Sequence, residues 1–152
     1  MSAAHHEAID HPLIGAWRLR DWVALDDDGT TTRPMGEAPN GLVVYSGDGT
    51  MLTAIGQGDR PRFASDDVTG GTDEERARAF RTFIAYGGRF TIEGDLVTHH
   101  VETSLFPNWV GTEQRRQWTL DAAPEVLTLT SPPLAVGGVT RVQRLTWVRQ
   151  RD

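Results

Sequence analysis

The sequence contains no cysteine, which excludes disulfides, thiolate catalysis and cysteine-ligated metal sites. It also lacks an apolar run near the roughly 20 residues that a membrane-spanning helix needs, and its N-terminus has no apolar stretch of signal-peptide length. Long basic stretches are missing too, and the net charge is −6, so the chain is not expected to follow a phosphate backbone. We therefore expect a soluble, cytoplasmic protein that binds neither nucleic acid nor a membrane.

The length of 152 residues is that of one domain with a buried core. Residues 1–12 are polar and end at a proline, and we predict that they form a flexible N-terminal lead-in. Residues 13–150 are predicted to form a single domain. The five tryptophans indicate a folded protein with a binding surface.

Most of this domain alternates between apolar and polar residues, as half-buried strands do. The alternating runs are short, and Gly, Pro and Asp separate them at a spacing typical of barrels. They predict about eight strands, which lie in residues 15–25, 41–46, 50–57, 113–121, 125–130 and 140–150 and in a hairpin within 89–104.

One helix is predicted over residues 72–86. Thr72 and Glu75 have the spacing of a capping box, and the acidic first turn suits the positive end of the helix dipole. Ala77, Phe80 and Ile84 recur at helical spacing, so we expect this apolar face to pack on the barrel core.

The hairpin contains the most informative residues of the chain. A two-residue turn at Gly94 and Asp95 pairs Phe90 with His99, which places His99 on an apolar face of the hairpin. Arg89, His100 and Glu102 then share the opposite face. If the pairing slips by one residue, the faces exchange and His100 with Glu102 becomes the inward pair.

Several segments resemble the lipocalin-like domain proteins of bacteria and fungi. Gly15-Ala16-Trp17 matches the Gly-x-Trp opening of lipocalins, in which the Trp closes one end of the barrel under an Arg from the last strand; Arg144 or Arg149 fits that description. The further matching segments are PMGEAPNGLVVYSGDGTM, DRPRFAS, FIAYGGRF and VTHHVETSLFPNWVGTEQRR. The resemblance covers residues 13 to about 149.

This resemblance implies an all-β fold, an eight-stranded antiparallel barrel around a small-molecule cavity. The helix is expected between strands three and four, whereas secreted lipocalins have theirs near the C-terminus. The resemblance fixes no single activity, although lipocalin-like barrels in natural-product biosynthesis include cyclases and isomerases.

Alternation in the strands predicts three polar side chains inside the barrel, Asp21, His99 and Arg116. His99 titrates near the pH at which a general base works, Asp21 is placed to orient it, and Arg116 is placed to stabilise a developing anion. This trio needs no cofactor. The alternative is structural: His99 is a hydrogen-bonded core residue, and Asp21 pairs with Arg116 or Arg144 at the closed end.

Aromatic residues are expected to contact a ligand. The apolar loop of residues 105–111 places Phe106 and Trp109 at the barrel rim, or else docked on the helix. Arg60 could hold an anionic group at the same mouth or tie down its own loop. Within the barrel, Phe90, Tyr45 and Trp118 are the expected lining residues.

A metal site is not expected. His100 and Glu102 project the same way from their strand, but beside Arg89, where a cation is disfavoured, and no third ligand has a recognisable spacing.

The sequence thus predicts a barrel that binds a small apolar organic molecule. The leading hypothesis is a cofactor-independent isomerase or cyclase that acts by acid–base catalysis on a carbonyl-bearing, natural-product-like substrate. The alternative is a non-catalytic carrier of a hydrophobic ligand, and a third reading is a filled barrel without a cavity. Pairing of two copies as a homodimer is left open.

Overall fold

The computed structural model describes residues 7–122 and 125–151. Within these residues, ten strands, one α-helix and one short 3₁₀ helix follow one another. Their bounds are β1 Gly15–Leu25, β2 Thr31–Thr32, β3 Asn40–Tyr45, β4 Thr50–Gly56, α1 Asp73–Arg81, β5 Phe83–Glu93, β6 Leu96–Ser104, η1 Pro107–Trp109, β7 Glu113–Ala122, β8 Glu125–Thr130, β9 Leu134–Val136 and β10 Val139–Arg149.

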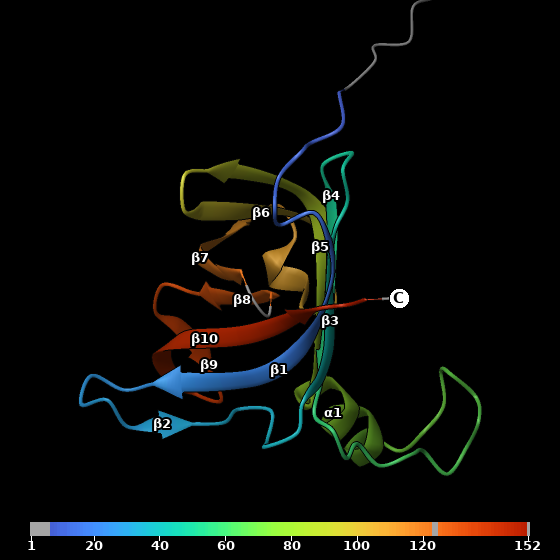
Figure 1. The fold of residues 1–152 in the computed structure, drawn as a ribbon. Coiled ribbons are helices and arrows are strands. Elements are labelled where there is room, and N and C mark those ends of the chain that lie inside the picture. Colours follow the sequence, from blue (N-terminus) through green and yellow to red (C-terminus); the bar gives the residue numbers. More distant parts are fainter. Residues whose placement is uncertain (1–6, 123–124, 152) are drawn as a thin grey trace, which may run out of the picture.

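Eight of the strands form a closed antiparallel barrel (Figure 1). The order around the ring is β1-β3-β4-β5-β6-β7-β8-β10, and β10 pairs with β1 to close it. Closure removes the exposed strand edges that an open sheet would leave. The predicted eight-stranded antiparallel barrel with one helix is confirmed.

The two shortest strands lie outside this ring. β2 pairs only with the end of β1, and β9 pairs only with the start of β10. Two and three residues are too short to produce a recognisable alternation. The helix therefore follows the fourth strand, β4, and the prediction that it lies between strands three and four is wrong.

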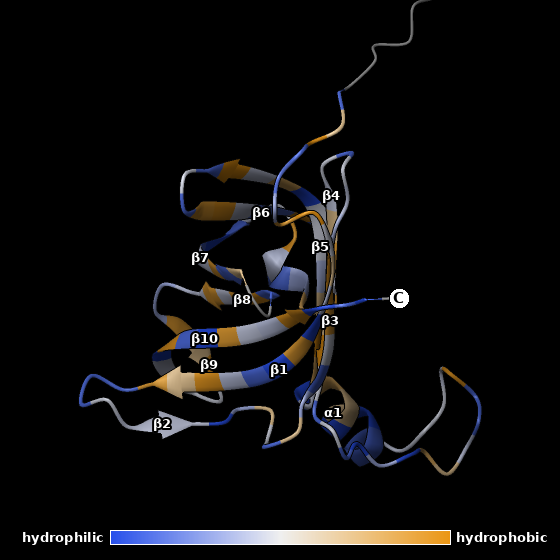
Figure 2. Ribbon diagram, viewed as in Figure 1, coloured by the Kyte–Doolittle hydropathy of each residue, from blue (hydrophilic) through white to orange (hydrophobic). Residues whose placement is uncertain are grey.

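Helix α1 is shorter and more exposed than its sequence pattern predicts. Its capping box is present, with reciprocal hydrogen bonds between Thr72 and Glu75. The helix ends at Arg81, however, and Phe83 already begins β5. No residue of the fully described α1 is buried, and Phe80 is 47% exposed. Figure 2 accordingly shows α1 mostly in hydrophilic colours. The prediction that the apolar face of this helix packs on the barrel core is therefore wrong.

Strand β1 contains a β-bulge that reverses its alternation. The pairing with β10 shifts between Leu19 and Asp21, so two successive β1 residues oppose one position of the partner. Beyond this bulge Trp22 is buried in the core. Asp21, which alternation predicts inside the barrel, therefore faces outward.

One end of the barrel is closed by the chain before β1. Leu13 and Trp17 are fully buried there, and the Arg149 guanidinium lies 4.2 Å from the centre of the Trp17 ring. Arg149, and not the exposed Arg144, is thus the Arg that packs on the opening Trp. Residues 1–6 of the predicted lead-in 1–12 lie outside the described residues; farther along, Ile9 N–H donates to the Gly47 carbonyl.

The hairpin of β5 and β6 has the predicted register. Phe90 pairs with His99, and Ile92 with Val97. Gly88 passes so close to β6 that an added Cβ would lie 2.0 Å from the His100 carbonyl oxygen, so only glycine fits there. Because Phe90 and His99 pair and share a face, His99 faces the interior, as the unslipped register predicts.

Candidate functional site

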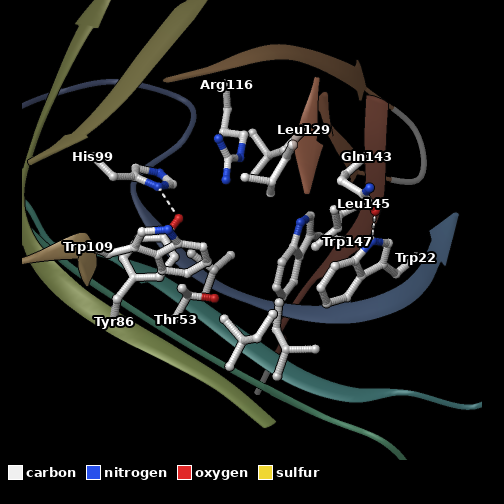
Figure 3. Close-up of a pocket in the computed structure, with 14 residues that line it drawn as sticks. Trp22, Thr53, Tyr86, His99, Trp109, Arg116, Leu129, Gln143, Leu145 and Trp147 are labelled. Atoms are coloured by element: carbon white, nitrogen blue, oxygen red, sulfur yellow. Dashed lines mark hydrogen bonds between the residues drawn. The ribbon is translucent and has the colours of Figure 1, made fainter. Parts of the chain in front are cut away.

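The barrel encloses a small cavity of about 50 Å³ (Figure 3). Every strand of the ring supplies at least one lining side chain, and the loop helix η1 and strand β9 supply one each. The lining is mainly apolar and aromatic, and its polar members are few. The lining residues are Trp22, Val43, Thr53, Ile55, Ile84, Tyr86, His99, Trp109, Arg116, Leu129, Leu134, Gln143, Leu145 and Trp147.

His99 lies in the wall of this cavity between two tyrosines. Its Nδ1 is 2.7 Å from the hydroxyl of Tyr86, and its Nε2 is 2.6 Å from the hydroxyl of Tyr45. Tyr45 comes from β3, two strands away from β5 and three from β6, so its bond to His99 crosses the interior. Both ring nitrogens of His99 are therefore occupied by protein groups.

Burial keeps His99 neutral. Desolvation, followed by the positive charges of Arg116 and His100, lowers its pKa from the ordinary 6.5 to about 3. Burial also raises the pKa values of Tyr45 and Tyr86 above the ordinary value for a phenol. At neutral pH the three side chains form an uncharged hydrogen-bonded cluster.

Arg116 projects from β7 into the same cavity (Figure 3). It is 9% exposed, and its Nη1 donates to the carbonyl of Arg115 at 2.8 Å. Within residues 7–122 and 125–151 no carboxylate forms an ion pair with it. A buried guanidinium without a counter-charge favours a ligand with electron-rich oxygen atoms.

A larger apolar hollow of about 600 Å³ lies at the end of the barrel near α1, η1 and β9. Phe106 lines this hollow and packs edge-on against Trp109, with ring centres 5.6 Å apart. Ile84, Trp109 and Leu134 line both the hollow and the inner cavity. These three side chains therefore lie between the inner cavity and the hollow.

The structure does not bring Asp21 to His99. The β1 bulge turns Asp21 away from the interior, where its carboxylate lies 3.3 Å from Arg33 Nε. The expectation that Asp21 orients His99 is corrected accordingly: two tyrosines hold the imidazole instead. His99 and Arg116 do meet in one cavity, as predicted from alternation.

Of the expected ligand contacts, only Trp109 lines the inner cavity. Phe90 is buried against the Tyr45 ring, behind the cavity wall. The indole nitrogen of Trp118 bonds to the Gly94 carbonyl at the closed end. Arg60 bonds to the Thr82 hydroxyl and the Ala79 carbonyl beside α1, which corresponds to the loop-tying alternative.

His100 and Glu102 point away from the interior. His100 contacts Thr91 Oγ1 at 3.0 Å, and Glu102 contacts Arg89 at 3.2 Å. In the described part of the chain, no three His, Asp or Glu side chains are grouped to hold a metal ion. None of the described helices has the length and hydropathy needed to cross a membrane.

Sequence reasoning missed four polar or aromatic members of the cavity, Tyr86, Trp22, Gln143 and Trp147. The helix predicted over residues 72–86 includes Tyr86, although Ile84 and Tyr86 alternate as strand residues do. Trp22 alternates with Asp21, which is predicted to face inward, and the bulge that brings Trp22 inward is not visible in the sequence. For Gln143 and Trp147, the alternation with Leu145 in β10 is the sequence signal that indicates an inward-facing side chain.

Comparison with known proteins gives two matches. The family model described as lipocalin-like domain matches residues 14–150. A protein of Aspergillus oryzae named 4'-hydroxy-3'-methoxypropiophenone carrier protein ppsC is 38% identical over 96 residues, which cover 57% of this chain and 85% of that protein. No solved structure matches the chain.

Proposed function

Because the chain belongs to the lipocalin-like domain family, we propose that it binds a small, largely apolar organic molecule in its barrel and releases it unchanged, as a carrier does. The single observation that supports this most strongly is the enclosed cavity, in which an apolar and aromatic lining surrounds a few polar groups. That combination is typical of sites for small organic ligands.

The state of His99 favours binding over proton transfer. A general base works best when its pKa lies near the operating pH and when a nitrogen is free to take the proton. The pKa of His99 is lowered to about 3, and tyrosine hydroxyls contact both of its nitrogens. Among the described residues, no Asp or Glu that could replace His99 as the base lines the cavity.

Covalent capture of a carbonyl ligand is also disfavoured. A Schiff base requires an amine, and the sequence contains no lysine side chain. Nor is there a cysteine to form a thiohemiacetal. Non-covalent binding is what the available groups support.

The size of the cavity implies that side chains move when a ligand binds. An engineered protein cavity of about 150 Å³ admits benzene, whereas this one measures about 50 Å³. The neighbouring hollow of about 600 Å³ shares the side chains of Ile84, Trp109 and Leu134 with it. Movement of these side chains would join the two spaces into one site for an aromatic molecule.

The similar fungal protein suggests the class of ligand. Its name assigns it to a hydroxylated, methoxylated propiophenone, an aryl ketone. We extend to this chain only the broader class, aromatic ketones.

A second candidate function is that of a cofactor-independent isomerase or cyclase. It is favoured by one observation, the convergence of Tyr86, His99 and Arg116 on an apolar cavity. The donors of Tyr86 and Arg116 would stabilise the oxygen of an enolate.

The test is isothermal titration of the protein with propiophenone, followed by chromatography of the recovered compound. Leu129→Phe, which fills the cavity, should lower the affinity about tenfold, a loss of about 1.4 kcal/mol. Arg144→Ala, which removes an exposed side chain of the outer face, should leave the affinity unchanged.

The two candidates differ in what happens to the bound ketone. A carrier returns it unaltered, and in D₂O its α-hydrogens exchange no faster than without protein. Accelerated exchange that requires Tyr86 would favour the isomerase or cyclase, and absence of saturable binding to any apolar ketone would contradict both.

A further inference from the structure

Trp147 has a buried donor without an acceptor. Its indole Nε1–H has no hydrogen-bond partner among the described residues, and the side chain is 1% exposed. Trp147 lines the cavity (Figure 3). Leaving such a group unsatisfied costs free energy, so its presence at the cavity wall points to an acceptor atom that a ligand supplies.

Tyr45 determines the tautomer of His99. The hydroxyl of Tyr45 contacts His99 Nε2 and no other polar group of the described chain, and its ring packs against Phe90. Tyr45 does not line the cavity. If Nε2 carried the proton, the Tyr45 O–H would have no acceptor; Tyr45 therefore donates, and Nε2 accepts.

The O–H of Tyr86 is then left without an acceptor. With Nε2 as acceptor, the neutral ring carries its proton on Nδ1, and that N–H donates to the Tyr86 hydroxyl oxygen 2.7 Å away. The O–H of Tyr86 has no other partner in the described structure, and Tyr86 lines the cavity. Its proton is thus directed toward a ligand.

The remaining polar side chains of the lining differ in whether they have a hydrogen-bond partner within the protein. Thr53 Oγ1 donates to the Leu42 carbonyl at 3.0 Å. Gln143 Oε1 accepts from Trp22 Nε1 at 2.8 Å. Arg116, by contrast, has further N–H groups at the cavity, and a guanidinium contains no acceptor atom. The unsatisfied groups that face the cavity are therefore donors.

We propose that the cavity recognises a hydrogen-bond acceptor: Tyr86 and Trp147 donate to oxygen atoms of the ligand beside the Arg116 guanidinium, and Tyr45 fixes His99 as the Nδ1–H tautomer that frees the Tyr86 proton. This inference rests on the proposed binding function and narrows it. It selects ketones, quinones, lactones and aryl ethers over hydrocarbons. His99 and Tyr45 are positioning residues, since they act through Tyr86.

The first part of the test needs no ligand. Long-range ¹⁵N–¹H correlation spectra of the wild-type protein at pH 7 report which nitrogen of each imidazole is protonated, and the His99 signals are those that disappear in His99→Gln. We expect a protonated Nδ1 and an unprotonated Nε2. The opposite tautomer would overturn the proposal.

The second part compares two probes, propiophenone and its hydrocarbon analogue propylbenzene. In Trp147→Phe and in Tyr86→Phe, which keep the rings, the preference for the ketone over the hydrocarbon should fall about tenfold. An unchanged preference in both variants would overturn the proposal. If neither probe binds to the wild type, the carrier function fails, and the nitrogen spectra still decide the tautomer.

Discussion

The hydroxyl of Tyr45 lies 2.6 Å from Nε2 of His99, deep in the barrel. The sequence has only two tyrosines, and the second, Tyr86, contacts the other nitrogen of the same ring. The imidazole is therefore held as a neutral hydrogen-bonding group. A residue that the sequence suggested as a base instead connects a core tyrosine to a cavity tyrosine.

Replacing His99 by Phe should destabilise the fold. Two buried hydroxyls would lose their partners, at about 1–3 kcal/mol each, and each kcal/mol lowers Tm by about 2–4 °C in a domain of this size. His99→Gln, which keeps one donor and one acceptor, should lose less. Thermal unfolding measures both, with His100→Gln on the outer face as a control that stays within about 0.5 kcal/mol of wild type. Equal losses in Phe and Gln variants would contradict the hydrogen-bonded cluster.

The stability should depend on pH through His99. Its pKa is about 3 in the folded protein, against an ordinary 6.5, so between these values the unfolded chain binds a proton that the folded chain does not. The contribution of neutral His99 is complete above about pH 6.5 and is lost as the pH falls toward 3, by about 1.4 kcal/mol per pH unit.

Urea unfolding at pH 7, 6 and 5 measures this slope. The advantage of wild type over His99→Gln should shrink at each step toward acid, whereas Arg144→Gln, on the exposed side of β10, should follow wild type. Parallel curves for wild type and His99→Gln would show that His99 is not kept neutral by burial.

Trp109 should control access to the cavity. Its ring lines both the inner cavity and the outer hollow, whereas Phe106 lines only the hollow. In Trp109→Ala, propiophenone should associate and dissociate several-fold faster, because one of the three side chains that the cavity and the hollow share is truncated. Phe106→Ala should change these rates less. Stopped-flow fluorescence of the remaining tryptophans measures them, and unaltered rates in Trp109→Ala would place the access route elsewhere.

Arg149 should stabilise the closed end of the barrel. Its guanidinium donates to the carbonyls of Ile14 and Pro12, pairs with Glu125 and stacks on Trp17. Because hydrogen bonds to a charged group contribute about 1.5–3 kcal/mol each, Arg149→Ala should lose about 2 kcal/mol or more in urea unfolding. Arg144→Ala, on the exposed side of the same strand, should lose little; similar losses in the two variants would contradict this role.

The sequence predicts the hairpin well and strand β1 poorly. In the hairpin, the turn at Gly94 and Asp95 sets the register, so the inward face of His99 follows from counting. In β1, one bulged residue moves Asp21 outward and Trp22 inward. Bulges depend on the partner strand, which the local sequence does not specify.

Tyr86 was not predictable for a related reason. The apolar spacing of Ala77, Phe80 and Ile84 continues smoothly past Arg81, where the helix ends. Pairing of β5 with β4 and β6 decides the conformation of Ile84 and Tyr86, and such tertiary pairing overrides a local helical pattern. The partner of His99 therefore became visible only in the folded barrel.

The most direct test of the account is an intermolecular NOE spectrum of the propiophenone complex with methyl-labelled protein. The methyl groups of Leu129 and Leu145 line the inner cavity, whereas those of Leu105 and Val136 line only the outer hollow. We predict NOEs from the aromatic protons of the ligand to Leu129 and Leu145. NOEs confined to Leu105 and Val136 would contradict binding inside the barrel.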